Sequence, residues 1–252
     1  MSVVKSNAVR VARPISEIPD LGKQRMLNAV TRGLSIGRWE ALEPHAQLVQ
    51  LRDDEVLSVC YQQTRHLYFP TTAVCMVTGV HNDTNESVDA TLIGNEGFVG
   101  MWTLTRKLHE SVDSKVKFGG AALRFRASIF EQEFEGNSAF RLSILRYLSA
   151  QLRVAAQESH CYRHHSIEQQ VAKVLVITQS RVSQAEIHLT HQDIASLLGV
   201  RREGVSLATH ELVNSGLLGQ QRGSILIIDS NGLKKRACDC TEMILHEYSG
   251  ER

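Results

Sequence analysis

The sequence predicts an α+β protein with an N-terminal antiparallel β-sheet half, one long central helix and a mainly helical C-terminal half. Three observations support this fold class. Short runs rich in β-branched and aromatic residues follow one another between about residues 51 and 127. An apolar stripe at three- and four-residue steps then extends over roughly three heptads, as in a long amphipathic helix. Two shorter helical patterns separated by a glycine come next, followed by two strand patterns.

The overall composition limits the class of protein. A chain of 252 residues is comfortable for two domains, and 42% hydrophobic with 22% charged residues is ordinary for a soluble protein. No apolar run reaches the length of a membrane span, and the N-terminus lacks the apolar core of a signal peptide. The five cysteines are odd in number and scattered, which favours reduced thiols. We therefore expect a cytoplasmic protein without membrane contact.

The N-terminal part is predicted to contain an arm and a β-rich domain. Residues 1–20 carry Pro14 and Pro19 and little periodicity, so we expect a loose arm. Residues 21–136 are expected to begin with short helices, up to about Val49, and to continue with strands. Many short strands without long helices between them indicate a sandwich or an antiparallel, jelly-roll-like β-roll. The expected strands are residues 56–61, 66–69, 73–78, 88–93 and 121–126.

Residues 137–162 are predicted to form the long helix and a hinge. A capping-box pattern at Ser128–Glu131 opens a short helix just before it. The long helix could pack on its own β domain or pair with its copy in a second chain, and the periodicity leaves both alternatives open. For a homodimer, the predicted interface residues are Phe140, Ile144, Tyr147, Leu148 and Leu152.

Residues 163–252 are predicted to form a winged helix-turn-helix domain. A second capping box, Ser166–Gln169, starts its first helix. Thr190 is expected to cap the next helix, Gly199 to make the turn, and residues 201–212 to form a helix whose apolar residues face the core. Two strands then turn at residues 222–223. This order of elements suits a helix that enters the major groove of double-stranded DNA.

The polar face of the 201–212 helix predicts how DNA would be contacted. An arginine fork matches O6 and N7 of guanine, and a glutamate carboxylate can accept from N4 of cytosine. We therefore predict Arg202 and Glu203 as base-reading residues. Ser206 is predicted as a third base contact, with a phosphate contact as its alternative. The residues predicted to contact the DNA backbone are Thr190, Arg201, Thr209 and Arg222, with the minor groove as the alternative for Arg222.

A different function remains compatible with this pattern. The formal net charge of the chain is only +1, and the charges around the predicted recognition helix nearly balance. The alternative is therefore a ligand-sensing module whose winged helix contacts a protein partner instead of DNA. Salt-dependent binding to DNA distinguishes the two.

The chain resembles the Crp/Fnr superfamily of bacterial transcription regulators over almost its full length. The resemblance is carried by residues 66–70, 92–100, 192–205, 216–218 and 223–229. It implies a cyclic-nucleotide-binding-like β-roll as sensor, a homodimer on the long helix, a pseudo-palindromic promoter site and RNA polymerase as a partner. Two departures stand out in the predicted recognition helix. Arg201 replaces the usual Ser or Thr cap, and Leu207 replaces the second base-reading arginine.

The predicted sensor departs from the family as well. After residues 94–97, no arginine stands in the small-residue context that binds a cyclic phosphate in the family's nucleotide-binding members. We therefore predict no cofactor and do not expect cyclic AMP as the effector.

Metal and catalytic sites are not predicted. Residues 160–165 hold the densest set of metal-capable side chains, including His160, Cys161 and His164, but a helix end with solvated imidazoles is the favoured interpretation. Cys238 and Cys240 are closer in sequence than the usual zinc-binding pair, so incidental thiols are favoured over a metal or redox role. The sequence contains no nucleophile elbow, phosphate-binding loop or HExxH motif, so no enzyme activity is expected.

Overall fold

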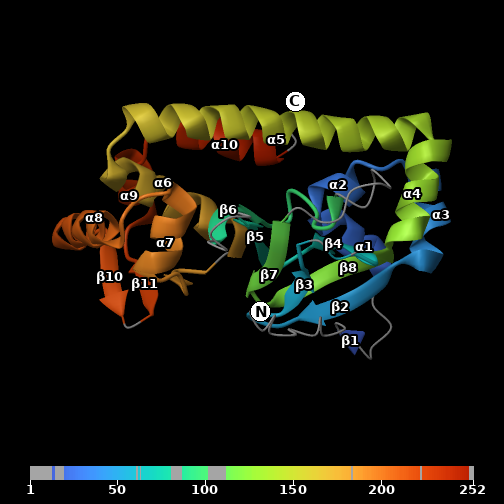
Figure 1. Cartoon of the computed structure of the whole chain (residues 1–252), viewed down its shortest axis with the longest axis horizontal. Helices are drawn as coiled ribbons and strands as arrows, with labels where there is room; N and C mark the ends of the chain where they lie inside the picture. The colour runs from blue at the N-terminus through green and yellow to red at the C-terminus, as the bar shows by residue number, and fades with distance from the viewer. Residues whose placement is uncertain are drawn as a thin grey trace, which may run out of the picture. The chain divides into compact units, whose positions relative to one another are not determined.

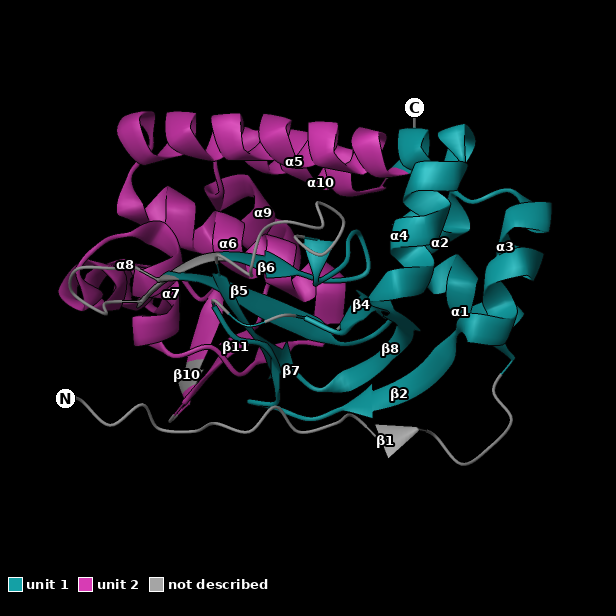
Figure 2. Cartoon of the chain, turned by 45° about the vertical axis from the view of Figure 1, so that its right-hand side comes forward, with its two compact units in different colours: residues 1–87, 91–143 teal, residues 88–90, 144–252 magenta. Residues whose placement is uncertain are grey.

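The computed structural model describes residues 13–14, 20–60, 62, 64–80, 87–101, 112–182, 184–221 and 223–249. The chain divides into two compact units, residues 1–87 with 91–143 and residues 88–90 with 144–252 (Figure 2). This division falls within the long helix, which the sequence-based boundaries treat as a separate segment. The predicted α+β class is confirmed. Among the described helices, none has both the length and the apolar character needed to cross a membrane.

The first unit begins with short helices, as the sequence predicts. They are α1 (Leu21–Leu27), α2 (Ala29–Arg32), α3 (Ile36–Leu42) and the 3-10 turn η1 (Glu43–His45) (Figure 1). The fully buried Asn28 holds α2 in place. Its side-chain oxygen accepts from the backbone N–H of Val30, and its amide nitrogen donates to the carbonyls of Pro70 and Gly97. One polar side chain thus caps a helix and ties it to the end of β4 and to the loop that contains Gly97.

Two four-stranded sheets follow, and their observed strand pairs are antiparallel. One sheet has the order β1 (Arg13–Pro14), β2 (Gln47–Leu51), β8 (Gly120–Arg126), β4 (His66–Pro70). The other has the order β3 (Val56–Ser58), β7 (Val112–Phe118), β5 (Val74–Val80), β6 (Ser87–Ile93). The sequence pattern predicts neither β2 nor β7.

The predicted loose arm is mostly outside the described residues. Arg13 and Pro14 are an exception, because they pair with Gln50 and Val49 of β2 as a short edge strand. Proline at a sheet edge is compatible with pairing because its missing N–H need not serve the ladder.

The interior of the first unit is apolar. A cluster of buried side chains draws on both sheets and consists of Val49, Leu51, Leu57, Tyr68, Ala73, Cys75, Val99, Val116 and Ala122. A second group is aromatic. Phe69 lies 5.0 Å from Phe98 and 5.0 Å from Phe130, and Phe130 lies 5.1 Å from Phe140, between ring centroids. These rings connect the sheet with the helices that follow it.

Helix α4 (Ala127–Gly136) begins one residue earlier than its predicted cap. The predicted capping box at Ser128–Glu131 is wrong, because the residue at the N-cap position is Arg126, and its side chain makes no capping hydrogen bond in the described structure. Strand β8 leads directly into the helix, and the N–H of Ala127 donates to the carbonyl of Arg65 at 2.9 Å. Neighbouring backbone therefore replaces the side-chain cap. The long helix α5 (Ser138–His164) follows Asn137, whose side-chain oxygen accepts from the N–H of Phe140 in the first turn.

The second unit contains most of α5 and the C-terminal elements. These are α6 (Ile167–Val182), β9 (Glu186–Ile187), α7 (His191–Leu198), α8 (Arg202–Asn214), β10 (Leu218–Gln221), β11 (Ser224–Ile227), α9 (Ser230–Arg236) and α10 (Cys240–Ser249). The predicted hairpin is present, and β9 adds a third strand to it. The predicted capping box before α6 is confirmed, since Ser166 and Gln169 exchange both hydrogen bonds. Helix α10 lies alongside α5 (Figure 1), where Val154, Ile177 and Ile244 join α5, α6 and α10 in one apolar cluster.

Candidate nucleic-acid interface

Helix α7 is capped and ended by local sequence signals. The N–H of Asp193 donates to the Thr190 hydroxyl at 3.1 Å, and the N–H of Thr190 donates to the Asp193 carboxylate at 2.8 Å. Thr190 is therefore the N-cap, as predicted. Gly199 ends the helix with a φ of 63°, a left-handed conformation that glycine adopts without strain. The chain then turns directly into α8.

Helix α8 has a buried face and an exposed one. Val205, Ala208 and Leu212 are buried, as predicted from their spacing. The exposed residues on its outer surface are Arg202, Glu203, Leu207, His210, Glu211 and Asn214, with Arg201 just before the first turn. Leu207 is 66% exposed, although leucine is an apolar residue. The first turn of α8 therefore presents a guanidinium group and a carboxylate side by side, with an isobutyl group one turn further on.

The predicted backbone contact of Thr209 is wrong. Thr209 is 0% exposed, and its hydroxyl has no hydrogen-bond partner among the described residues. It follows Val205 by four residues, so it lies on the same side of the helix as the core stripe. Its polar side chain suggests the outer face, whereas its position in the helix places it inside.

Ser206 and His191 connect the two helices of the motif. The Ser206 hydroxyl and Nδ1 of His191 form a hydrogen bond of 2.9 Å. Burial, and next the nearby Arg202 guanidinium, lower the pKa of His191 from its usual 6.5. The imidazole is thus kept neutral near pH 7. Ser206 is half-buried in this arrangement, and its predicted base contact stays a prediction.

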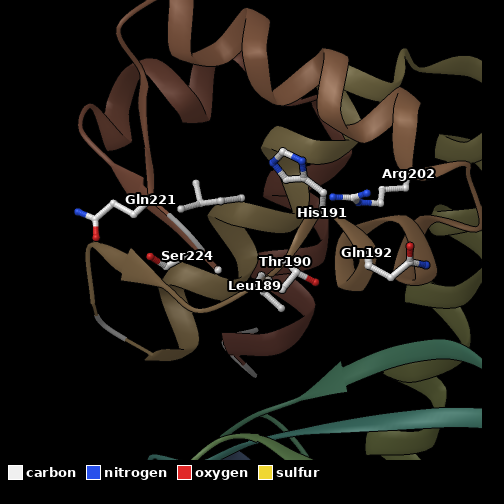
Figure 3. A pocket seen from close by; sticks show the side chains of 9 residues that line it. Leu189, Thr190, His191, Gln192, Arg202, Gln221 and Ser224 are labelled. Carbon is white, nitrogen blue, oxygen red and sulfur yellow. The ribbon is translucent and has the colours of Figure 1, made fainter.

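A hollow of about 510 Å³ lies between the helix-turn-helix and the hairpin (Figure 3). Its lining residues are Leu189, Thr190, His191, Gln192, Arg202, Gln221, Gly223, Ser224 and Ile225. In Figure 3 the Arg202 side chain extends toward His191. The N-terminus of α7 lies at this hollow, and the first backbone N–H groups of a helix can donate hydrogen bonds to an anion.

The sequence pattern does not single out His191, Gln192 or Gln221 as part of this site. Their positions in the first turn of α7 and at the end of β10 are the signals that could have identified them. Arg222, predicted to contact DNA from the hairpin turn, lies outside the described residues.

The structure divides the residues predicted for a dimer interface. Phe140 and Ile144 are buried within the chain itself, where Phe140 packs on Phe130, so their place on an intermolecular seam is a wrong prediction. Tyr147 and Leu148 are half-buried, and Leu152 is 72% exposed.

Residues 169–236 match the family of Crp-like helix-turn-helix domains. No curated protein matches the sequence. Among solved structures, a Crp/Fnr-family protein from Eubacterium rectale is similar over 83% of this chain and 98% of its own, with a TM-score of 0.65 and 14% identity. TTHB099, a CRP-family transcriptional regulator from Thermus thermophilus, is similar over 75% of this chain and 95% of its own, with a TM-score of 0.61 and 14% identity. FixK2 from Bradyrhizobium japonicum is similar over 77% of this chain and 98% of its own, with a TM-score of 0.59 and 16% identity. At these identities the similarity establishes the fold.

Proposed function

We propose that this protein is a non-enzymatic, DNA-binding transcription regulator of the Crp/Fnr type. The observation that carries the proposal is the exposed first turn of α8, where Arg202 lines the hollow beside the hairpin and the exposed Glu203 follows it in the helix. The match of residues 169–236 to Crp-like helix-turn-helix domains supports it. In this proposal α8 enters the major groove and the hairpin lies against the flanking backbone.

The exposed side chains suggest what α8 reads. Arg202 donates to O6 and N7 of a guanine, and Glu203 accepts from N4 of a cytosine. Leu207 adds an apolar contact, which suits the methyl group of a thymine. Arg201 and the first N–H groups of α7 hold phosphates, with the hollow as the place for the sugar-phosphate strand.

The same proposal includes a homodimer that binds a pseudo-palindromic promoter site, with RNA polymerase as a further partner. One exposed row along α5 follows the three- and four-residue steps of a coiled-coil seam. It consists of Leu142, Leu145, Ser149, Leu152 and Ala156. A two-fold axis along this seam would present two copies of α8 to half-sites about 34 Å apart. The proposal includes no cofactor, and cyclic AMP is not proposed as an effector.

Selection of bound duplexes from a random-sequence DNA pool tests the function. We expect an enriched two-fold-symmetric site whose affinity falls steeply as salt concentration rises. Arg202→Ala should then cost about 1–3 kcal/mol on the selected site and relax one base position. Arg126→Ala removes the same charge from an exposed position on β8 and should leave binding unchanged.

Three results would contradict the proposal. Failure to enrich any duplex, or binding that is insensitive to salt, would favour a protein partner for the winged helix. An equal loss by Arg202→Ala on selected and random DNA would remove Arg202 from the base-reading residues.

A further inference from the structure

We propose that Cys161, His165, Cys238 and Cys240 form a structural zinc site in the second unit. Their potential ligand atoms, three sulfurs and one imidazole nitrogen, all lie within 4.8 Å of one another. Cys161 belongs to the last turn of α5, and His165 follows the end of that helix. The other two ligands lie at the turn between α9 and α10, where Cys240 opens α10. The proposal does not depend on the proposed function.

The distances suit a single tetrahedral ion. The sulfurs of Cys161 and Cys238 are 3.9 Å apart, and the Cys240 sulfur lies 3.8 Å from Nδ1 of His165. With Zn–S bonds near 2.3 Å and Zn–N bonds near 2.0 Å, two ligand atoms of a tetrahedron lie about 3.5–3.8 Å apart. A disulfide would need about 2.05 Å. An iron–sulfur cluster distributes its thiolates over more than one iron and needs a wider spacing.

The chemistry of the four ligands selects zinc. Three thiolates and one imidazole are a known structural zinc set, and soft thiolates disfavour magnesium and calcium. The three cysteines are buried and His165 is half-buried, so the ion would have a closed first shell, as in structural and not in catalytic sites.

A buried cation lies close to the proposed site. Zinc with three thiolates carries a charge of −1, which is costly to bury alone. The ammonium group of Lys173 is fully buried and close enough to act electrostatically on both Cys161 and Cys238. Lys173 pairs with Glu158, which faces it from α5. Lys173 therefore faces both this carboxylate and the cysteines, and its positive charge offsets part of the negative charge of thiolate ligands.

Neighbouring amides orient the ligands. The side-chain nitrogen of Gln157 donates to the sulfur of Cys240 at 2.7 Å. That of Gln170, itself buried, donates to the carbonyls of Cys161 at 3.2 Å and His165 at 2.8 Å. Hydrogen bonds of this kind around a metal fix ligand orientation and support affinity. The two ligand-bearing segments thus converge on one point although they are 77 residues apart in sequence.

Metal analysis of the full-length protein tests the site. After expression with zinc, purification without chelator and gel filtration, we expect one zinc ion per chain. Cys161→Ser, Cys240→Ser and His165→Asn should each lose it. Two matched controls should keep it: Cys60→Ser, which changes a cysteine outside the cluster, and His164→Asn, which changes the exposed neighbour of His165.

Cobalt substitution and metal removal cover the case in which a variant fails to fold. Wild-type protein loaded with Co²⁺ should show thiolate-to-metal charge transfer and the visible bands of tetrahedral cobalt. Removal of zinc should lower Tm, and its return should restore it. Wild-type protein without zinc after loading would overturn the proposal. So would cluster variants that fold and retain as much zinc as the controls, an octahedral cobalt spectrum, or a Cys161–Cys238 disulfide in place of the metal.

Discussion

The exposed seam on α5 allows the proposed dimer to be tested through one side chain. Leu152 is 72% exposed in the single chain, so it contributes little to the stability of its own unit. In a two-fold dimer along α5 it would become buried against the partner copy. Truncation by Leu152→Ala should therefore weaken association and leave the folded chain intact.

The expected magnitude follows from the buried area. Complete burial of a leucine side chain is worth about 1.5–3 kcal/mol relative to exposure, and alanine retains part of that. Because a two-fold interface uses the same residue from both chains, the loss is counted twice. We expect a cost of about 3 kcal/mol of dimer, which is a change of about 100-fold in the dimer dissociation constant.

Sedimentation over a range of protein concentrations measures this constant. Ile36→Ala is the matched control, because Ile36 is 69% exposed on α3 and does not belong to the seam. Circular dichroism should show the same helix content for both variants. A dissociation constant for Leu152→Ala equal to that of the wild-type protein, or an equal weakening by Ile36→Ala, would refute the proposed seam.

Two further predictions concern buried and half-buried groups in the second unit. Glu158→Gln leaves the buried Lys173 ammonium without its carboxylate and should lower the free energy of unfolding by about 3 kcal/mol in urea titrations; unchanged stability would show that the pair is dispensable. For His191, NMR titration should give a pKa below 6.5, mainly because of burial, and Arg202→Ala should raise it. Because the folded-state pKa is the lower one, stability from the neutral imidazole is present above about pH 6.5 and is lost as the pH falls below it. A pKa that Arg202→Ala does not move would contradict this account.

The parts of the fold that were predictable from sequence are those with strong local signals. Thr190 with Asp193, Gly199 and the Ser166–Gln169 box each satisfy backbone groups within a few residues, so the spacing alone identifies them. The helix-turn-helix and its hairpin follow from such signals. These local signals do not require knowledge of the tertiary neighbours.

Strand β7 shows why other parts were not predictable. Its buried positions alternate as expected for a strand, but one of them is Ser114. The hydroxyls of Ser114 and Ser58 form a hydrogen bond of 2.6 Å across the β3–β7 pair, which makes burial of both possible. A serine is expected at an exposed position unless its hydrogen-bond partner is known. The alternation of buried and exposed residues in β7 is therefore not recognisable in the sequence.

Helix α5 is ambiguous in a related way, because the sequence does not show which of its apolar residues are covered by the chain itself. It has one apolar row that contains Phe140 and Ile144 and another that contains Leu145 and Leu152. The sequence periodicity predicts a single stripe in which Phe140, Ile144 and Leu152 lie together, and it does not identify the partner of each residue. The chain's own aromatic cluster covers Phe140, and this leaves the other row exposed.

The cysteine cluster lies where α5 ends and α6 begins. Helix α6 packs against α8, so the orientation of α8 relative to the end of α5 depends on the stiffness of the joint between α5 and α6. The bidentate Arg153–Glu247 ion pair also joins α5 to α10, although solvent screens its half-exposed guanidinium group. The apolar contact of Val154, Ile177 and Ile244 contributes to the stiffness of the joint as well. A metal bound by residues on both sides of α6 would fix the same joint through bonds that are stronger and more directional than either contact. In a dimer on α5, that joint would set the distance between the two recognition helices.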